Sequence, residues 1–310
     1  MTELDAAARR MVTGALYPPF LYAIGPDDAR RALALMQVPP AEPAGAGHHV
    51  LSVATARGPM RVHVLVPHDA GTRAPVVLYA HGGGWVIGGY DTHHRLAAAL
   101  CRETGAIVVV PEYTRVPEAR HPAAVEQLTA ALGWIRSGAL PVGADLSRVA
   151  VAGDCAGATM VAAVAMADRD TGAPPLAAMV LLYPLGRPGP RDGSAAEFAT
   201  GAGLRLEDVR RLWRGYSPSA DPLADPLAAR RPAGLPATLL VTAEADVNRD
   251  PAERFGARLR AAGVPVTAVR YLGTVHDFAV LDALRWTPAA RAVVGQAVDH
   301  LSAAFRIGTP

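Results

Sequence analysis

The sequence contains no lysine, and its charge is nearly balanced. All 30 basic residues are arginine, against 28 acidic residues, which gives a formal net charge of +2 over 310 residues. The arginines are scattered along the chain, so the sequence lacks the basic patch that binding to nucleic acid requires. We therefore expect no nucleic-acid partner.

Cysteine and long apolar runs are also scarce. Cys101 and Cys155 are 54 positions apart and form no CxxC pair, so neither a disulfide framework nor a zinc knuckle is predicted. No apolar run reaches the roughly 18 residues of a membrane-spanning helix. The acidic N-terminal stretch lacks the apolar core of a secretory signal. These absences predict a reduced, cytoplasmic protein with no membrane span.

Hydrophobic residues, in contrast, make up 51% of the chain, enough for a sizeable core. Apolar runs of strand length alternate with helical patterns, which predicts an α/β fold with one eight-stranded, mostly parallel sheet and helices on both faces. The first two runs mix polar and apolar residues and suit antiparallel edge positions, whereas the later ones suit buried parallel strands. The eight runs are VLSVATA (50–56), MRVHVLVP (60–67), APVVLYAHG (74–82), AIVVVPEY (106–113), RVAVAGDC (148–155), AAMVLLYPL (177–185), ATLLVTAEAD (237–246) and VTAVRYLG (266–273).

Two segments interrupt this alternation. Two helices are predicted before the sheet, followed by a Pro/Gly-rich link. Later, some fifty residues separate two strands, far more than a βα loop needs, and they contain one amphipathic helix near 204–216. We interpret the second segment as a cap over the ends of the strands. The predicted organisation is N-terminal helices at 1–48, a core at 49–185, a cap insertion at 186–230 and the rest of the core at 231–310. The core helices are expected near 91–104, 122–137, 156–169, 251–263 and 287–305, and the last strand and helix could pair in a homodimer.

A triple glycine follows the third run, in YAHGGGWVIGG at 79–89. Consecutive glycines let the backbone approach a ligand closely and expose N–H groups that can hold a developing oxyanion. Phosphate binding is the alternative. The dinucleotide fingerprint, however, would need glycine in place of Ile87, and the GK[ST] of a P-loop is missing. A glycine-rich turn without chemistry remains open.

A second glycine-rich turn surrounds Cys155 in VAVAGDCAGATM. Gly153, Ala156 and Gly157 are small, as required where a strand turns sharply into a helix and presents a nucleophile. A buried structural cysteine is the alternative, since free cysteine often behaves as a small hydrophobe. Cys101, inside a predicted helix, fits that structural interpretation.

A base and an acid follow in the order that a nucleophile elbow demands. Asp246 comes directly after a buried strand, and His276 comes just beyond the last strand, so both are expected at the carboxyl edge of the sheet. The other histidines fit surface or structural positions: two in the link (His48, His49), two adjacent on a helix (His93, His94) and one near the C-terminus (His300). None has the spacing of a metal-binding pair, and no metal or cofactor is predicted.

Together, HGGGW (81–85), EYTRVPEARHPAA (112–124), GDCAG (153–157), AEADVNRD (243–250) and HDF (276–278) resemble the hormone-sensitive-lipase-like family of bacterial carboxylesterases, which have the α/β-hydrolase fold. The resemblance runs from about residue 50 to the end, and it implies that the N-terminal cap helices at 1–48 and the insertion at 186–230 together form that family's cap. It implies His81 as a brace for the glycine loop and a supporting role for the stretch around Tyr113. The catalytic roles that it implies are a nucleophile at Cys155, a base at His276, an orienting acid at Asp246 and an oxyanion hole from the N–H groups of Gly83, Gly84 and Ala156.

The chain departs from the family at three places: cysteine replaces the nucleophilic serine, the Pro-Leu that usually follows the acid is missing, and Asp277 stands where glycine is common. A thiol beside His276 at a helix N-terminus could form a thiolate–imidazolium pair and then a thioester acyl-enzyme. Thioesters favour amine and thiol acceptors over water more than oxygen esters do.

We therefore expect an acyl-enzyme catalyst acting on a small-molecule acyl ester or thioester. Three alternatives stay open. The acyl group could pass to an amine, alcohol or thiol in an acyltransferase or cyclase. The fold could be a retired hydrolase that only binds a ligand. A serine-to-cysteine change engineered into an esterase would also leave this sequence.

Overall fold

The computed structural model describes residues 2–40, 45–71, 73–189, 193–200, 203–217, 221–229 and 231–307. Within them lies one eight-stranded sheet in the order β1-β2-β4-β3-β5-β6-β7-β8, which confirms the predicted α/β-hydrolase fold. The strands from β4 through β8 in this order pair in parallel. Their bounds are β1 (Ala46–Thr55), β2 (Gly58–Pro67), β3 (Ala74–Ala80), β4 (Ile107–Pro111), β5 (Ala144–Asp154), β6 (Met179–Leu182), β7 (Thr238–Ala245) and β8 (Val266–Val275).

The first two strands are antiparallel, as expected, but only the first of them, β1, lies at an edge of the sheet. β2 pairs with β1 on one side and with β4 on the other, so its prediction as an edge was wrong. The reason is His63, which reads as polar yet is buried: its ring stacks on Tyr90 with centroids 4.0 Å apart, and its Nε2 lies 2.9 Å from Glu112. His48 joins the same stack from β1, so it belongs to the sheet and not to a link.

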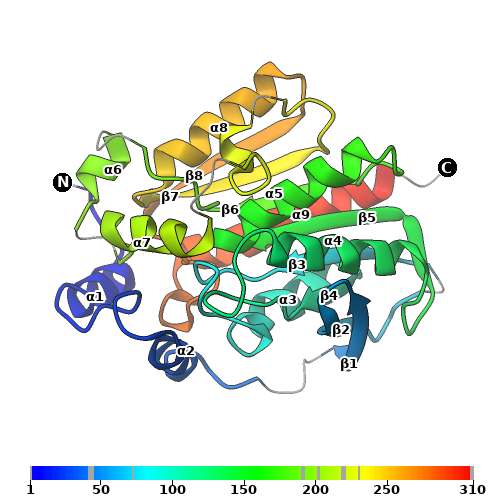
Figure 1. Cartoon of the computed structure of the whole chain (residues 1–310), viewed down its shortest axis with the longest axis horizontal. Coiled ribbons are helices and arrows are strands. Elements are labelled where there is room, and N and C mark those ends of the chain that lie inside the picture. Colours follow the sequence, from blue (N-terminus) through cyan, green and yellow to red (C-terminus); the bar gives the residue numbers. More distant parts are fainter. Residues whose placement is uncertain are drawn as a thin grey trace.

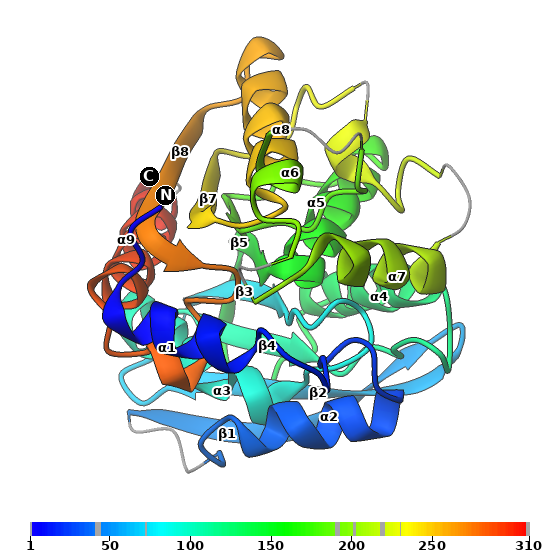
Figure 2. The same cartoon turned by 90° about the vertical axis from the view of Figure 1, so that its left-hand side faces the viewer.

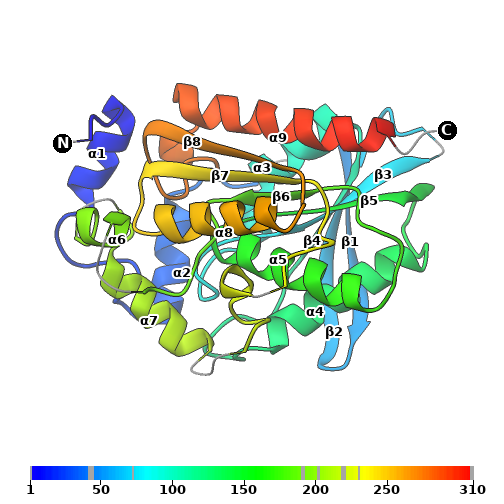
Figure 3. The same ribbon diagram turned by 90° about the horizontal axis from the view of Figure 1, so that it is seen from above.

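Helices cover both faces of the sheet (Figure 1). Seen from above, α9 lies along one face, where it contacts α3, and α4, α5 and α8 cover the other (Figure 3). The apolar runs of the central strands are therefore buried on both sides, as their continuous Val and Leu content predicts. The helix bounds are α3 (Tyr90–Thr104), α4 (Ala123–Arg136), α5 (Cys155–Asp170), α8 (Arg249–Ala261) and α9 (Pro288–Ile307).

The remaining helices gather at one end of the sheet (Figure 2). They are α1 (Ala6–Gly14), α2 (Pro26–Leu35), α6 (Gly193–Glu197) and α7 (Leu206–Tyr216). The segment predicted as an insertion contains the expected amphipathic helix as α7, and also α6 and a 3-10 turn at Pro226–Ala228 that sequence analysis did not predict. Residues 41–44 of the predicted link, and 190–192, 201–202, 218–220 and 230 of the predicted insertion, lie outside the described residues. Among the helices that are described, none is long and apolar enough for a membrane crossing.

Helix α5 approaches the sheet unusually closely at Gly157. A Cβ added there would lie 2.0 Å from the carbonyl oxygen of Ala80, at the end of β3. Because that obstacle is backbone, it cannot move aside as a flexible side chain can. Glycine at this position is therefore required by packing.

We predict that Gly157→Ala lowers the free energy of unfolding by about 2–3 kcal/mol through overpacking, although alanine is normally the better helix former. Gly295→Ala in α9 is the matched control, because an added Cβ meets nothing within 4 Å there, and it should stabilise by about 0.5–1 kcal/mol. Chemical denaturation of both variants measures the difference. Equal stability of the two would contradict the packing argument.

Candidate active site

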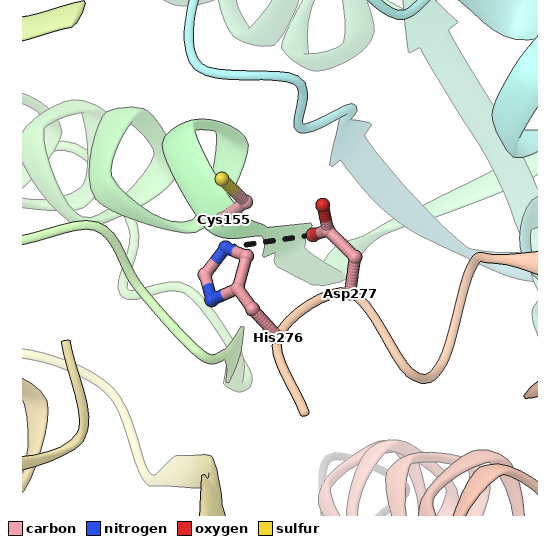
Figure 4. A group of neighbouring side chains, drawn as sticks. All are labelled: Cys155, His276 and Asp277. Carbon is pink, nitrogen blue, oxygen red and sulfur yellow. Dashed lines mark ion pairs between the residues drawn. The ribbon is translucent and has the colours of Figure 1, made fainter. Parts of the chain in front are cut away.

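Strand β5 ends at Asp154, and Cys155 begins α5 at once. The backbone of Cys155 has φ 49°, the left-handed region that a non-glycine residue rarely adopts. Gly153 makes the turn possible, because a Cβ there would lie 2.6 Å from the backbone of Gly157. This is the strand–turn–helix geometry of a nucleophile elbow. The Cys155 side chain points from the head of α5 (Figure 4), and the residue is only 1% exposed.

His276 and Asp246 meet at the ends of the two neighbouring strands β8 and β7. The imidazole Nδ1 of His276 lies 2.6 Å from the Oδ2 of Asp246, and both residues are buried. The other oxygen of Asp246 accepts a hydrogen bond of 2.8 Å from the backbone N–H of Asn248. A carboxylate held in this way fixes the tautomer with the proton on Nδ1, leaving Nε2 to face Cys155.

A third polar side chain, Asp277, lies beside this pair and was not predicted as part of the site (Figure 4). The Sγ of Cys155, a ring nitrogen of His276 and a carboxylate oxygen of Asp277 all lie within 4.8 Å of one another. Asp277 also has a left-handed backbone, with φ 61°, which turns its side chain back toward the ring. The sequence signal was the aspartate in HDF, but its proximity to Cys155 arises only from tertiary packing.

The electrostatics of the site differ from the expectation of a preformed thiolate–imidazolium pair. Burial raises the pKa of the Cys155 thiol, and the attraction of the His276 charge offsets this only in part. Burial alone would lower the pKa of His276, but the negative charges of Asp246 and Asp277 raise it well above 6.5. Burial also raises the pKa of the Asp277 carboxyl. The thiol form of Cys155 is therefore favoured at rest.

The triple glycine runs directly past the elbow. A Cβ on Gly82 would lie 2.2 Å from an Asp154 oxygen and 2.9 Å from the Cβ of Cys155. Gly83 and Gly84 have φ 97° and 59°, and no acceptor for their N–H groups occurs among the residues described. The N–H of Ala156 is one of the helix-terminal donors that have no partner within α5. These three amides are the donors that sequence analysis assigned to an oxyanion hole.

Buried polar residues support this loop from behind. Asp154 accepts hydrogen bonds from Tyr79 and, at 3.1 Å, from the N–H of Gly82, and it lies 3.3 Å from His93. Burial opposes a charge on His93, but the Asp154 carboxylate raises the pKa of the ring above its ordinary value. Of the two roles expected for His93, the structure therefore shows the structural one, at a buried position.

His81 contacts the loop as expected. Its Nδ1 donates to the carbonyl of Gly82 at 2.8 Å, and its ring stacks on Tyr113 at 4.3 Å. Burial and the neighbouring His93 lower the pKa of His81 to about 3, so the ring is neutral at physiological pH. Arg115, in the same stretch as Tyr113, donates to the carbonyl of Gly88. The stretch around Tyr113 thus supports the glycine loop, and Arg115 does so through a backbone carbonyl of that loop.

Helix α7 closes the other side of the glycine loop. Leu212 lies so near Gly84 that a Cβ there would be 2.5 Å from its methyl group. Trp85 stacks on Tyr216 with centroids 4.1 Å apart and meets Trp213 edge-on at 4.8 Å. The loop is therefore packed between the core and α7.

A cavity of about 450 Å³ lies beside His276 and Asp277. Its walls come from α1, α2, the connection between them, and the start of α7, and most of them are apolar. Tyr22 reaches the site from that connection, and burial followed by the Asp277 charge raises its pKa well above 10. Apolar residues lining the cavity include Met11, Phe20, Leu21, Ile24, Leu33, Met36, Ile87, Leu204, Val280 and Leu281.

Comparison with known proteins agrees with this geometry. A family model described as an alpha/beta hydrolase fold matches residues 77–280, which is more than half of the chain. The chain therefore belongs to the α/β hydrolase fold family.

Several of the proteins similar to this chain are named esterases. Esterase LipI of Mycobacterium tuberculosis is 37% identical over 211 residues, covering 66% of each chain. Carboxylesterase NlhH of the same organism is 33% identical over 251 residues, covering 79% of this chain and 78% of NlhH. A thermostable esterase from Pseudomonas putida superposes with a TM-score of 0.93 at 32% identity over 98% of both chains. A hyperthermophilic esterase from Pyrobaculum calidifontis gives 0.88 at 28% identity over 99% of this chain and all of that one.

Because these relatives and structural neighbours are esterases, the chain is an enzyme of the carboxylic ester hydrolase type. Esterases act on esters, so the partner expected in the pocket is a small-molecule ester.

The charges around the Cys155–His276 pair predict an alkaline-shifted rate profile. The pair must lose one proton before sulfur can attack, and the pKa of each member is raised. We therefore expect kcat/KM to rise with pH through a midpoint above the 6.5 of an ordinary histidine. A profile measured with an acyl ester in chelator-treated buffer checks this.

Asp277→Asn is the variant whose pH profile of kcat/KM should be compared with that of the wild type. The Asp277 charge raises the pKa of both Cys155 and His276, so its removal should move the midpoint to lower pH. An unchanged or more alkaline midpoint would show that Asp277 does not act on the pair electrostatically.

Proposed function

We propose that the chain belongs to the hormone-sensitive-lipase-like group and cleaves small or medium acyl esters through a covalent acyl-enzyme on Cys155. In this proposal His276 is the base, Asp246 orients it, and the amides of Gly83, Gly84 and Ala156 form the oxyanion hole. The observation that carries the proposal is the position of the His276 ring, which is 2.6 Å from Asp246 on one side and faces the elbow thiol on the other.

The reaction begins from the Cys155 thiol beside a neutral His276 ring, which is the state of the pair after it has lost one proton. As Sγ attacks the ester carbonyl, its proton passes to Nε2 of His276, and the carbonyl oxygen becomes an oxyanion held by the loop amides. The imidazolium then gives that proton to the departing alcohol, and the C–O bond breaks to leave a thioester on Cys155. Water, deprotonated by His276, attacks the thioester, the C–S bond breaks as the imidazolium returns the proton to sulfur, and the carboxylic acid is released.

A proposed cap over the core also indicates which acyl groups the enzyme would accept. We assign residues 1–48 and 186–230 to a cap over the core at 49–185 and 231–310. Two observations support this assignment: α1 and α2 line the cavity, and α7 packs on the glycine loop. The apolar walls favour an alkyl or aryl acyl group that buries its surface against them, at about 25 cal/mol per Å².

Acyl transfer is the second candidate, because the acyl group would be held as a thioester in a mostly apolar cavity. A thioester is more selective for amines and thiols over water than an oxygen ester is. An acceptor bound in that cavity would therefore compete with hydrolysis at the deacylation step.

The acyl-enzyme proposal predicts a mass shift on one cysteine. With a p-nitrophenyl acyl ester, the chain should release p-nitrophenol, and intact mass with peptide mapping should place an acyl adduct on Cys155. Cys155→Ala and His276→Ala should each lower kcat by at least about 10³-fold. Cys101→Ala is the matched control, since this other buried thiol is remote from the site and its pKa is raised to about 12 by burial. Acylation that persists in Cys155→Ala would contradict the proposal.

Restoring serine tests the role of sulfur. In Cys155→Ser the acyl-enzyme becomes an oxygen ester, so we expect a smaller fraction of acyl groups to pass to an added amine or thiol and a larger fraction to water. The measurement is the ratio of transfer to hydrolysis products at fixed acceptor concentration in both proteins. An identical ratio would remove the acyl-transfer candidate and leave hydrolysis.

A further inference from the structure

We propose that Cys155, His276 and Asp277 together form a binding site for one thiophilic divalent cation, with Zn²⁺ as the representative ion. The ligand atoms are the Sγ of Cys155, the Nε2 of His276 and the Oδ1 of Asp277 (Figure 4), and the last two residues line the cavity. The site itself does not depend on the esterase proposal.

The spacing of these atoms suits a single ion. In a tetrahedral zinc site with bonds of about 2.0–2.3 Å, the ligand atoms are roughly 3.3–3.7 Å apart. The Nε2 of His276 and the Oδ1 of Asp277 are 3.5 Å apart, inside that range. The whole set lies within 4.8 Å, so the thiol needs a movement of about an ångström at most to complete the site.

Two of the ligand atoms are buried without a hydrogen-bond partner. Across the part of the chain that the structure describes, the Nε2 of His276 and the Oδ1 of Asp277 each have no donor or acceptor within hydrogen-bonding geometry. They face each other at 3.5 Å, an ion-pair distance without hydrogen-bonding geometry, so part of the cost of burying them remains, and a metal ion that both of them coordinate would remove it. Their shared orientation toward the thiol is the observation that points to a ligand.

The surroundings provide what metal ligands usually have. Asp246 accepts the hydrogen bond from the Nδ1 of His276, which is the carboxylate–histidine–metal arrangement that orients the ring and increases its basicity. Thiolate and carboxylate charges from Cys155 and Asp277 balance a divalent ion. Sulfur, imidazole and carboxylate together favour Zn²⁺ over Mg²⁺ or Ca²⁺, which prefer oxygen ligands alone.

The cavity provides a route of entry and a fourth position. Asp277 and His276 line it, so an incoming ion reaches them without passing through the core. On binding, the thiol proton of Cys155 and the proton carried by the Nε2 of a charged His276 leave to solvent, sulfur, nitrogen and carboxylate oxygen lone pairs bond to the metal, and the hydrated ion gives up all of its water ligands but one. The remaining position is held by water.

Metal binding and acylation both need the Sγ of Cys155, so they exclude each other. This consequence, unlike the site itself, rests on the proposed function. A bound ion would shut off acyl-enzyme formation, and a chelator would restore it.

Cobalt titration of the chelator-stripped full chain tests the site directly. We expect one equivalent of Co²⁺ to give the thiolate-to-metal charge-transfer absorption and the visible bands of tetrahedral coordination, and one equivalent of Zn²⁺ to displace it. Cys155→Ser should lose the charge-transfer absorption, whereas Cys101→Ser, the matched thiol control, should keep it. Absence of the absorption in the wild type, or its persistence in Cys155→Ser, would overturn the inference.

Two further variants test the other groups. Asp277→Asn and Asp277→Gly both tolerate a left-handed backbone, so they should fold, and each should weaken Zn²⁺ binding by more than about 100-fold in competition with a chromophoric chelator. Asp246→Asn, which affects only the orientation of the ring, should weaken it by about 10–100-fold. Unchanged affinity in both Asp277 variants would exclude Asp277 as a ligand.

The inference and the esterase proposal can fail separately. If Zn²⁺ binds but the stripped protein forms no acyl adduct, the metal site stands and the esterase mechanism fails. If the stripped protein is acylated but binds no Co²⁺ or Zn²⁺, the reverse holds. If both succeed, Zn²⁺ should inhibit ester hydrolysis reversibly, and activity that persists in the Zn²⁺-loaded wild type would contradict the shared use of the sulfur.

Discussion

The position of Cys155 depends on how closely two stretches of backbone approach each other at the carboxyl ends of β3 and β5. Gly157 lies against the Ala80 carbonyl, and Gly82 lies against Asp154 and Cys155, at distances that leave no room for a side chain. This contact sets the left-handed turn at Cys155 and places the glycine loop amides beside the thiol. The sheet, the helices on its two faces and the buried network around Asp154 hold these two stretches of backbone in place.

The charged side chains near that contact form two layers, one behind the glycine loop and one beside the Cys155 thiol. Behind the loop, Asp154 is compensated by His93 and by hydrogen bonds from Tyr79 and Gly82, while His81 stays neutral. Beside the thiol, Asp277 lies 3.5 Å from the Nε2 of His276. The first layer is buried behind the glycine loop. The second lines the cavity, and it is where the proposed ester or metal ion would be received.

The fold could be predicted from the sequence because its signals are local. Continuous apolar runs indicated the parallel strands, and small residues around Cys155 indicated the sharp turn. The prediction that β2 lies at an edge was wrong because it depended on contacts that are not local. His63 looks solvent-exposed in the sequence, but a ring from α3 and a ring from β1 bury it. The proximity of Asp277 to Cys155 and the approach of Tyr22 from the N-terminal segment likewise depend on contacts between distant segments. No spacing rule along the chain could reveal them.

The packing of α7 on the glycine loop has a mechanical consequence. Leu212 touches the loop at Gly84, and Trp85 is stacked between Tyr216 and the edge of Trp213. In the proposed mechanism, the helix that forms one wall around the substrate is therefore fixed to the glycine loop whose amides would hold the oxyanion. A bulky substrate that displaced this helix would also displace those amides, so the fit of the acyl group and the alignment of the proposed hydrogen-bond donors would be set by one rigid unit.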